Sequence, residues 1–304
     1  MTRLTACLQA GGRTLTSKGG GQTIGETLHG LVSRLEKTSD TPGLDAQVLL
    51  SRLLGRLRSW VLAHPEVPLS KNQFSTLEES VTRLEGGEPL AYILGTWEFF
   101  GLDFQVTPDV LIPRPETEML VERAIIWLRK LTHGDRSFRV MDVGTGCGCI
   151  AIALALNVPN ITITATDISS AALKVATKNA ERMHISDRIT FIEADLFHKL
   201  SIPDPFSLIV ANLPYIPTKT LQNIPVYHRE PTLALDGGYD GLVIIRHFLK
   251  KAPTWLHPGG SIMFEIEASE GVAVQLLVSE TFPKARIHLH KDLAGHDRLL
   301  EVQT

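Results

Sequence analysis

Several features that define protein classes are scarce or missing in this chain of 304 residues. Cysteine occurs only three times, as Cys7, Cys147 and Cys149, which is too few for a disulfide framework and indicates a reducing compartment. No apolar run reaches about 18 residues, so no membrane span is expected. The N-terminus lacks the apolar core of a signal peptide, and the sequence therefore predicts a cytoplasmic protein.

An excess of one charge is also missing. The chain has 30 Lys and Arg residues against 33 Asp and Glu residues, with a formal net charge of −3 and a pI of about 6.4. A strongly basic nucleic-acid surface is therefore not expected. Hydrophobic residues make up 43% of the chain, which is enough for a large core, and the length suits two domains.

The first third of the sequence has a helical pattern. Residues 1–22 are rich in Gly, Ser and Thr, which predicts a flexible tail. Apolar residues at helical spacing and a capping box that begins at Ser70 predict a small helical bundle over residues 23–94. An aromatic and β-branched stretch that is broken by Gly101 predicts a β-hairpin linker over residues 95–112.

From residue 113 to residue 304, strand patterns alternate with helical patterns, which predicts an α/β domain with a parallel, doubly wound sheet. The last two strands are separated by a turn-rich segment and predict an antiparallel end. This combination is typical of methyltransferase-type Rossmann folds. The expected strands cover residues 138–143, 161–166, 189–192, 208–211, 261–266, 285–290 and 299–302.

A glycine-rich loop, Asp142-Val143-Gly144-Thr145-Gly146-Cys147-Gly148, leads from the first of these strands into a helix. Its glycines allow a tight turn and the close approach of a ligand to the backbone, which fits either a dinucleotide or S-adenosylmethionine. Asp142 at the strand tip would repel a pyrophosphate but can engage the cationic end of a methionine moiety, so we expect S-adenosylmethionine. Cys147 and Cys149 have no second pair of ligands nearby, and we expect no metal.

Two further acids follow the next two strands. Asp167 lies 25 residues after Asp142, where a carboxylate would accept hydrogen bonds from two ribose hydroxyls. Asp195 is placed to accept a hydrogen bond from an adenine amino group, and Leu196 could pack on the ring. Helix capping or loop solvation explains each acid equally well by itself. Three acids at three successive strand ends beside a glycine loop favour the cofactor site.

The tetrapeptide Asn212-Leu213-Pro214-Tyr215 ends the fourth strand, at the edge of the sheet where ligands bind. Asn212 offers a side-chain oxygen, and Pro214 forces the preceding Leu213 into an extended shape that can direct its carbonyl the same way. Two converging acceptors can hold both hydrogens of a planar NH2 group while Tyr215 lies flat against the attached π-system. These four residues are therefore candidate catalytic and substrate-binding residues, with an ordinary turn as the alternative.

Together these motifs resemble the PrmC/HemK family of release-factor glutamine methyltransferases. The resemblance covers about residues 44–300 and includes the string Leu111-Ile112-Pro113-Arg114-Pro115-Glu116-Thr117-Glu118, together with residues 87–95 and Glu230-Pro231. Two positions depart from the family pattern. Leu213 stands where the family usually has Pro, and Glu267 stands where it usually has Gly.

The resemblance implies a class I S-adenosylmethionine-dependent methyltransferase fold, Rossmann-like with seven strands, over residues 113–304. It implies transfer of a methyl group from S-adenosylmethionine to the glutamine side-chain nitrogen in the Gly-Gly-Gln motif of class I peptide chain release factors, which modulates translation termination and leaves S-adenosylhomocysteine. Residues 23–94 would dock the release factor. Asn212 would also border the cofactor, and Arg114, Glu116 and Thr117 would close the site, with a purely structural joint as the alternative.

Two other functions stay open. Asn-Leu-Pro-Tyr also resembles the motif of rRNA adenine dimethyltransferases, so an adenine-N6 methyltransferase that acts on RNA or DNA would share this chemistry, although the near-neutral charge counts against it. A non-catalytic module that binds a translation factor is the second alternative, and the intact loop and tetrapeptide count against it. The tail contains Gly20-Gly21-Gln22, the same tripeptide as the Gly-Gly-Gln substrate motif. In a glycine-rich tail, chance is the simplest explanation for this match.

Overall fold

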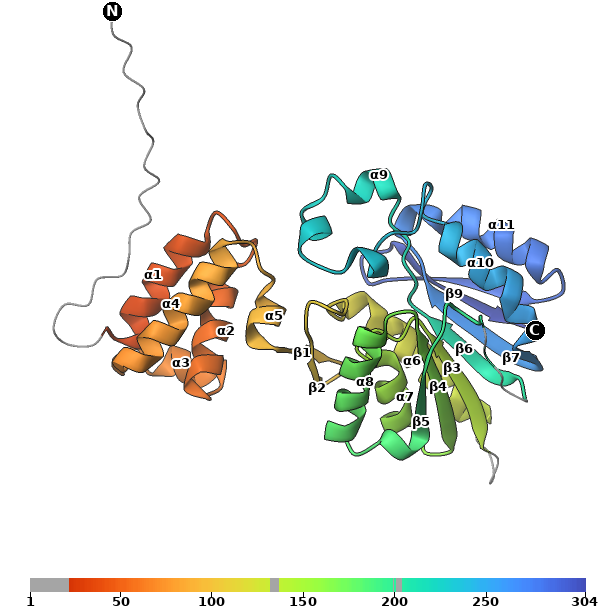
Figure 1. Ribbon diagram of the computed structural model, residues 1–304, viewed down its shortest axis with the longest axis horizontal. Helices are drawn as coiled ribbons and strands as arrows, with labels where there is room; N and C mark the ends of the chain where they lie inside the picture. Colours follow the sequence, from red (N-terminus) through yellow and green to blue (C-terminus); the bar gives the residue numbers. More distant parts are fainter. Residues whose placement is uncertain (1–21, 132–136, 199, 201–203) are drawn as a thin grey trace, which may run out of the picture. The chain divides into compact units, whose positions relative to one another are not determined.

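The computed structural model describes residues 22–131, 137–198, 200 and 204–304 (Figure 1). The chain divides after Leu94 into two compact units. The predicted tail, residues 1–22, lies outside the description except for Gln22, and so does Cys7. Among the helices of the described ranges, none has both the length and the apolar character needed to cross a membrane.

The first unit is a bundle of short helices, as its apolar periodicity predicts. The capping box at Ser70 and Gln73 is present, and Arg34 binds Glu78 and Glu85 through ion pairs that join the first helix to the fourth. The inward stripes form one apolar core with fully buried leucines. The helices are α1 (Ile24–Leu35), α2 (Pro42–Leu54), α3 (Arg58–Ala63), α4 (Lys71–Glu85) and α5 (Leu90–Leu94).

The second unit begins with a hairpin of β1 (Thr96–Phe99) and β2 (Leu102–Gln105), which confirms the hairpin predicted around Gly101. Phe100 and Gly101 form its turn with φ values of +55° and +72°, the left-handed pair of a tight hairpin. The amide N–H of Phe100 donates to the Glu118 carboxylate over 2.8 Å, which ties the turn to the helix that follows.

Seven strands form one sheet in the order β5-β4-β3-β6-β7-β9-β8. The first five strands in this order, β5, β4, β3, β6 and β7, are parallel to one another. Strand β9 runs antiparallel to both of its neighbours, β7 and β8. The predicted fold class and all seven predicted strand positions are thereby confirmed. The strands are β3 (Phe138–Val143), β4 (Ile161–Asp167), β5 (Ile189–Glu193), β6 (Phe206–Ala211), β7 (Leu256–Glu265), β8 (Arg286–Lys291) and β9 (Asp297–Gln303).

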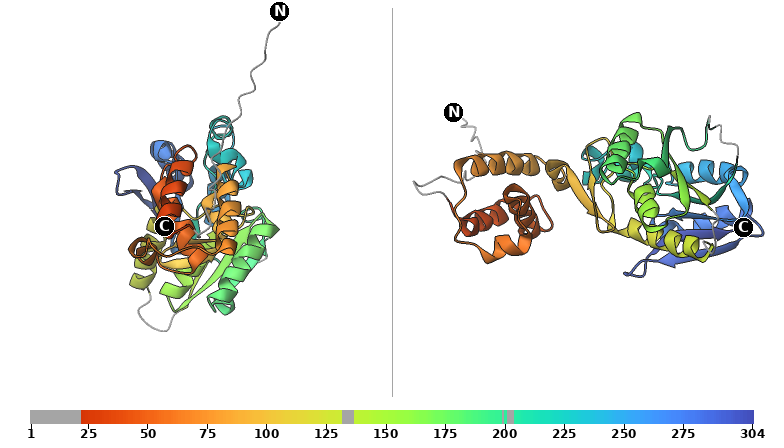
Figure 2. Two further views of the ribbon diagram at one scale, coloured as in Figure 1. Left: turned by 90° about the vertical axis from the view of Figure 1, so that its left-hand side faces the viewer. Right: turned by 90° about the horizontal axis from the view of Figure 1, so that it is seen from below.

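Helices cover both faces of this sheet. Figure 1 shows α8 (green) and α11 (blue) on opposite sides of it, and Figure 2 shows the same sheet from two further directions. On the second face Phe248 packs against Phe206 and Phe264 of the strands within one large apolar core. The helices on one face are α6 (Glu118–Leu131), α7 (Cys149–Asn157) and α8 (Ser170–Arg182), those on the other are α10 (Val243–Lys251) and α11 (Gly271–Thr281), and α9 (Thr218–Leu221) lies in the loop after β6.

The strand order fixes where a ligand can bind. The chain proceeds from β3 through β4 to β5 on one side and returns to place β6 on the other side of β3. Such a reversal opens a crevice at the carboxyl ends of the two central strands, because their connections leave in opposite directions. Val143 at the end of β3 pairs with Ala211 at the end of β6, so the glycine loop and Asn212 begin side by side.

Candidate active site

A cavity of about 520 Å³ opens at the carboxyl edge of the sheet. It is bordered by the glycine loop, by the segments after β4 and β5, and by the tetrapeptide after β6. The sequence-predicted residues that line it are Gly144, Gly146, Asp167, Asp195, Leu196, Asn212, Leu213 and Pro214. Those that are not among its lining residues are Asp142, Thr145, Cys147, Gly148, Arg114, Glu116, Thr117 and Tyr215.

The glycine loop depends on left-handed backbone at two critical positions. Gly144 has a φ of +75°, and a Cβ there would lie 3.2 Å from the Leu213 side chain. Gly148 has a φ of +84°, and a Cβ there would lie 3.1 Å from the Ala176 Cβ of α8. Side chains at these positions would strain the backbone and crowd its neighbours, so glycine keeps the loop tight enough to border the cavity.

Asp142 lies beneath the loop and is completely buried. The Thr145 hydroxyl donates to its carboxyl over 2.6 Å, and burial raises the pKa of Asp142 to about 7. Since this carboxyl does not line the cavity, it supports the loop from behind, and its expected engagement with a methionine moiety stays a prediction. Cys147 and Cys149 are likewise buried free thiols, and neither is among the lining residues of the cavity.

Asp167 lines the cavity at the end of β4. Its two carboxylate oxygens accept hydrogen bonds from the backbone N–H groups of Gly146 at 2.8 Å and Ser169 at 2.9 Å. Burial raises its pKa. Each oxygen can accept a second hydrogen bond, so the carboxylate can still receive hydroxyl groups from a ligand. Across the cavity, Asp195 is exposed and Leu196 takes a left-handed φ of +54°.

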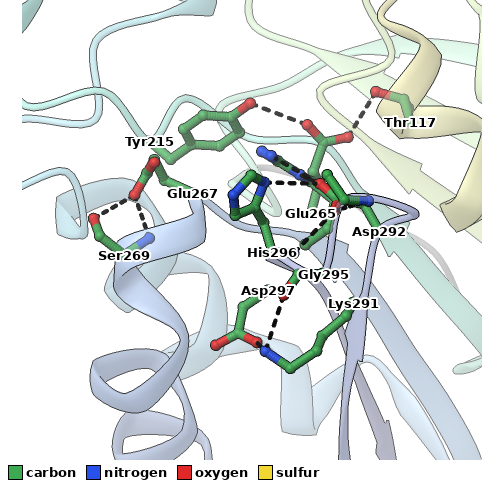
Figure 3. A network of polar contacts seen from close by, with 12 residues as sticks. Thr117, Tyr215, Glu265, Glu267, Ser269, Lys291, Asp292, Gly295, His296 and Asp297 are labelled. Carbon is green, nitrogen blue, oxygen red and sulfur yellow. Dashed lines mark hydrogen bonds and ion pairs between the residues drawn. The ribbon is translucent and has the colours of Figure 1, made fainter.

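The Asn212 side chain belongs to a chain of buried polar groups. Its Nδ2 donates to the Thr117 hydroxyl over 3.0 Å, and that hydroxyl donates to Oε2 of Glu265 over 2.6 Å. The Tyr215 hydroxyl donates to the other oxygen, Oε1, over 3.0 Å (Figure 3). Burial raises the pKa of both Glu265 and Tyr215, so the phenol stays protonated and acts as a donor.

An ion pair joins two segments of the cavity wall. The buried carboxylate of Glu230 binds the Arg114 guanidinium and accepts a hydrogen bond from the backbone N–H of Ile112 over 3.1 Å. Leu111 and Pro231, which neighbour this pair in sequence, both line the cavity. The Arg114–Glu230 pair therefore links the two segments that contribute Leu111 and Pro231 to the cavity lining. Glu116 is exposed on the same turn that buries Thr117.

Comparisons with known proteins agree with this geometry. The family model described as PrmC N-terminal domain matches residues 26–95, and the one described as methyltransferase small domain matches residues 124–227. A release factor glutamine methyltransferase from Coxiella burnetii is 40% identical over 278 residues, which cover 91% of this chain and 98% of that protein. The chain belongs to the release factor glutamine methyltransferase family.

A second relative supports the same assignment, and a solved structure shares the fold. The release factor glutamine methyltransferase of Bordetella pertussis is 39% identical over 259 residues, which cover 85% of this chain and 93% of that protein. The solved catalytic domain of hMettl16 is 16% identical with a TM-score of 0.52, and the match covers 77% of this chain and 82% of that one. The latter likeness concerns the fold alone and places the second unit among methyltransferase folds.

Leu213, which departs from the Pro expected at this position, lines the cavity. Its side chain is 3% exposed and packs into the large core of the second unit. The next residues run beside the turn at Gly237, where a Cβ would lie only 2.7 Å from the Tyr215 Cα. Glycine at 237 therefore lets the two segments meet closely, and the Gly237 N–H donates to the Ile216 carbonyl over 2.8 Å.

Sequence reasoning missed Asn179, a fully buried residue of α8. Its Nδ2 donates to the carbonyls of Cys147 at 2.9 Å and Gln105 at 3.0 Å, and its Oδ1 accepts from the Gln105 N–H at 2.7 Å. One amide thus joins the glycine loop to β2. An Asn within the apolar stripe of a helix was the available signal, because a buried amide needs several partners. Glu265 was missed as a site residue in the same way.

Proposed function

We propose that this protein transfers the methyl group of S-adenosylmethionine to the side-chain nitrogen of the glutamine in the Gly-Gly-Gln motif of class I peptide chain release factors. One observation carries the proposal: Asn212 gives its NH2 group to Thr117, which leaves its oxygen available where the glycine loop and the tetrapeptide border the same cavity. The membership in the release factor glutamine methyltransferase family supports the substrate. Such a substrate implies a cytoplasmic enzyme.

The cavity wall suits S-adenosylmethionine. Asp167 has acceptor capacity left for ribose hydroxyls, since a carboxylate offers about four lone-pair sites and backbone N–H groups do not take all of them. Asp195 and Leu196 would receive the adenine, and the backbone at Gly144 and Gly146 would face the methionine part. When bound, the cofactor supplies an electrophilic methyl group on a positively charged sulfur.

The acceptor side has to overcome a weak nucleophile. An amide nitrogen is unreactive because its lone pair is delocalised into the carbonyl, so alignment with the methyl group is the first requirement. The Asn212 oxygen and the Leu213 carbonyl would accept its two N–H bonds. Positive charge grows on this nitrogen as the new bond forms, and the two acceptors then bind it more tightly than in the ground state. The nitrogen afterwards loses one proton to water.

The decisive experiment combines the purified protein, S-adenosylmethionine with a deuterated methyl group, and a class I release factor. We expect the label on the peptide that carries Gly-Gly-Gln, located by fragment-ion mass spectrometry. A release factor with the motif glutamine changed to asparagine is the matched substrate and should stay unlabelled. A parallel reaction contains RNA and DNA. Label on adenine, or no label on the release factor, would overturn the proposal.

We further propose that the helical bundle, residues 23–94, docks the release factor, because one glutamine side chain offers little specificity. Leu57 and Leu62 of the bundle are 77% and 50% exposed, which suits an apolar contact. Changing both to Ser should raise the KM for the intact release factor several-fold at constant kcat. The KM for a short Gly-Gly-Gln peptide should not change, and equal effects on both substrates would contradict docking.

A further inference from the structure

We propose that Thr117 and Glu265 are positioning residues that decide which end of the Asn212 amide faces the substrate. This inference rests on the proposed function, because it assigns the control of the acceptor oxygen on which that function depends. The three residues come from distant parts of the sequence and meet at Asn212, which lines the cavity, whereas Thr117 and Glu265 are not among its lining residues. Together with Tyr215 they form a hydrogen-bonded series, which we call the amide relay.

The amide relay is short, buried and continuous. Asn212 Nδ2 lies 3.0 Å from Thr117 Oγ1, and Thr117 Oγ1 lies 2.6 Å from Glu265 Oε2. Thr117 and Glu265 are each only 2% exposed. Tyr215 occupies the remaining Glu265 oxygen at 3.0 Å, and Figure 3 shows the carboxylate between the two hydroxyls. Water therefore has little access to the two central groups, Thr117 and Glu265, while Asn212 reaches the cavity.

The direction of the amide relay follows from counting protons. When the Glu265 carboxylate is ionised it can only accept, so Thr117 then gives its single hydroxyl hydrogen to Glu265. The Thr117 oxygen then has only lone pairs to offer, and Asn212 must present its NH2 group to it. The Asn212 oxygen is left for the opposite side. The two ends of an amide have nearly the same shape, so this polarity, and not packing, sets the orientation.

A reversed amide would disable the proposed reaction. With its NH2 group turned outward, Asn212 would oppose the N–H bonds of a glutamine with further N–H bonds. It would also repel the positive charge that grows on the nitrogen during transfer. The cost falls on the chemical step, because the acceptor matters most where that charge is largest. Glu265 thereby acts on the reaction without touching the substrate.

The same logic makes the amide relay sensitive to protonation. A proton on Glu265 Oε2 would be donated to Thr117, whose own hydrogen would then be free for the Asn212 oxygen. The charged groups that act on Glu265 are Arg298, which favours ionisation, and Glu116, which opposes it, while burial is the main cause of its raised pKa. Turnover should therefore decline, as pH falls, through a pKa above the ordinary carboxyl value of 4.5.

The first test observes the Asn212 side chain directly and needs no substrate. In protein labelled with nitrogen-15 asparagine, the Asn212 NH2 signal, assigned by its loss in Asn212→Ala, should show slow hydrogen exchange. Thr117→Ser should keep this protection, because serine retains the hydroxyl. Thr117→Val, which removes the hydroxyl at nearly constant volume, should abolish it. Protection that survives in Thr117→Val would overturn the amide relay.

The second test measures turnover with the release factor. We expect Thr117→Val to lower kcat about tenfold, the effect of one lost hydrogen bond, and Thr117→Ser to restore most of it. Glu265→Gln should remove the acidic limb of the pH profile. Thr281→Val is the matched control, since Thr281 also donates a hydroxyl, to the Leu277 carbonyl at 2.9 Å, but lies outside the amide relay.

The outcomes separate this inference from the proposed function. Equal losses of kcat in Thr117→Val and Thr117→Ser, at unchanged affinity for S-adenosylmethionine, would show that the methyl packing matters and would overturn the amide relay. A wild-type protein that protects the Asn212 amide but never labels the release factor would contradict the proposed function and leave the relay standing. Thermal unfolding of each variant confirms that it is folded.

Discussion

The two sides of the cavity are held in place by different kinds of contact. On the side of β3 to β5, carboxylates hold backbone groups, as Asp167 does with the N–H groups of Gly146 and Ser169. On the side of β6 and β7, side chains hold other side chains, as Thr117 does between Asn212 and Glu265. The geometry of the first side depends mainly on the backbone conformation of its loop. The geometry of the second side depends on which of a few side-chain atoms donate hydrogen bonds and which accept them.

This difference has a physical consequence for substitutions. A loop shaped by left-handed glycines responds to added volume, since any Cβ strains the backbone or meets a neighbour. A buried polar series responds to the loss or reversal of a single proton, even when the volume is unchanged. We therefore expect changes on the first side to alter binding of the cofactor and changes on the second side to alter turnover.

The largest expected effect is that of Asn212→Ala. Removal of an acceptor aimed at developing charge should lower kcat by about 10² to 10³-fold, while the affinity for S-adenosylmethionine falls far less. Steady-state kinetics and calorimetry measure the two quantities. Asn223→Ala is the matched control, because Asn223 is exposed and its side-chain NH2 group donates to the Lys219 carbonyl. Near-normal turnover in Asn212→Ala would remove the distinction between the two sides.

A smaller effect, on the binding of S-adenosylmethionine and not on turnover, is expected from Asp167→Ala. This change removes the carboxylate that binds two backbone N–H groups and that we expect to receive ribose hydroxyls. The Kd for S-adenosylmethionine should rise by about 10- to 100-fold, as for lost hydrogen bonds to a charged group, with kcat largely kept at saturation. Calorimetry measures the Kd, and Asp187→Ala on an exposed turn serves as control. A fall in kcat without a change in Kd would contradict the prediction.

The carboxyl beneath the glycine loop predicts a pH effect on stability. Burial raises the pKa of Asp142 from 3.8 to about 7, so the folded state binds this proton more tightly than the unfolded chain. The stabilisation is complete below the unfolded pKa and is lost as pH rises through about 7. We expect Asp142→Asn to flatten the decline of the unfolding free energy, by at most about 1.4 kcal/mol per pH unit. Urea titrations at several pH values test this, and parallel curves for both proteins would contradict it.

The smallest effect on turnover is expected from Leu213→Pro. The acceptor at this position is a backbone carbonyl, and Pro restores the usual family residue, so kcat should change by less than about threefold. Stability should fall by about 1 to 3 kcal/mol because the buried leucine side chain is lost from the core. Steady-state kinetics measure the effect on kcat, and urea unfolding measures the effect on stability. A loss of kcat as large as that of Asn212→Ala would show that the side chain itself orients the substrate.

Much of this molecule follows from local sequence patterns. All seven strands of the sheet were predicted. The five parallel strands are apolar runs between turns, and a turn-rich segment separates the last two, antiparallel strands. The glycine loop, Asp167, Asp195 and Asn212 were predicted to share one edge because the carboxyl ends of parallel strands meet there. The cavity lining agrees with that expectation. Position along a strand was thus enough to bring these residues together.

Pairings between distant side chains did not follow from the sequence. Thr117 meets Glu265 across 148 positions and Asn212 across 95, so no local pattern connects them. Arg114 is expected to close the site, and that role stays a prediction; its ion pair with Glu230, 116 positions away, had no signal in the sequence. Asp142 was placed correctly at its strand tip, but the direction of its side chain depends on how the loop folds back. Burial of polar groups is a tertiary property, and periodicity does not report it.

The last strand of the chain has a consequence for biosynthesis. β9 lies between β7 and β8, so both remain without one of their hydrogen-bonding neighbours until residues 297–303 have left the ribosome. The sheet that borders the cavity cannot close before residues 297–303 have been synthesised, whereas the N-terminal bundle is complete by Leu94 and can fold much earlier. A nascent chain stalled before residue 297 would expose two open sheet edges, the kind of surface that promotes aggregation.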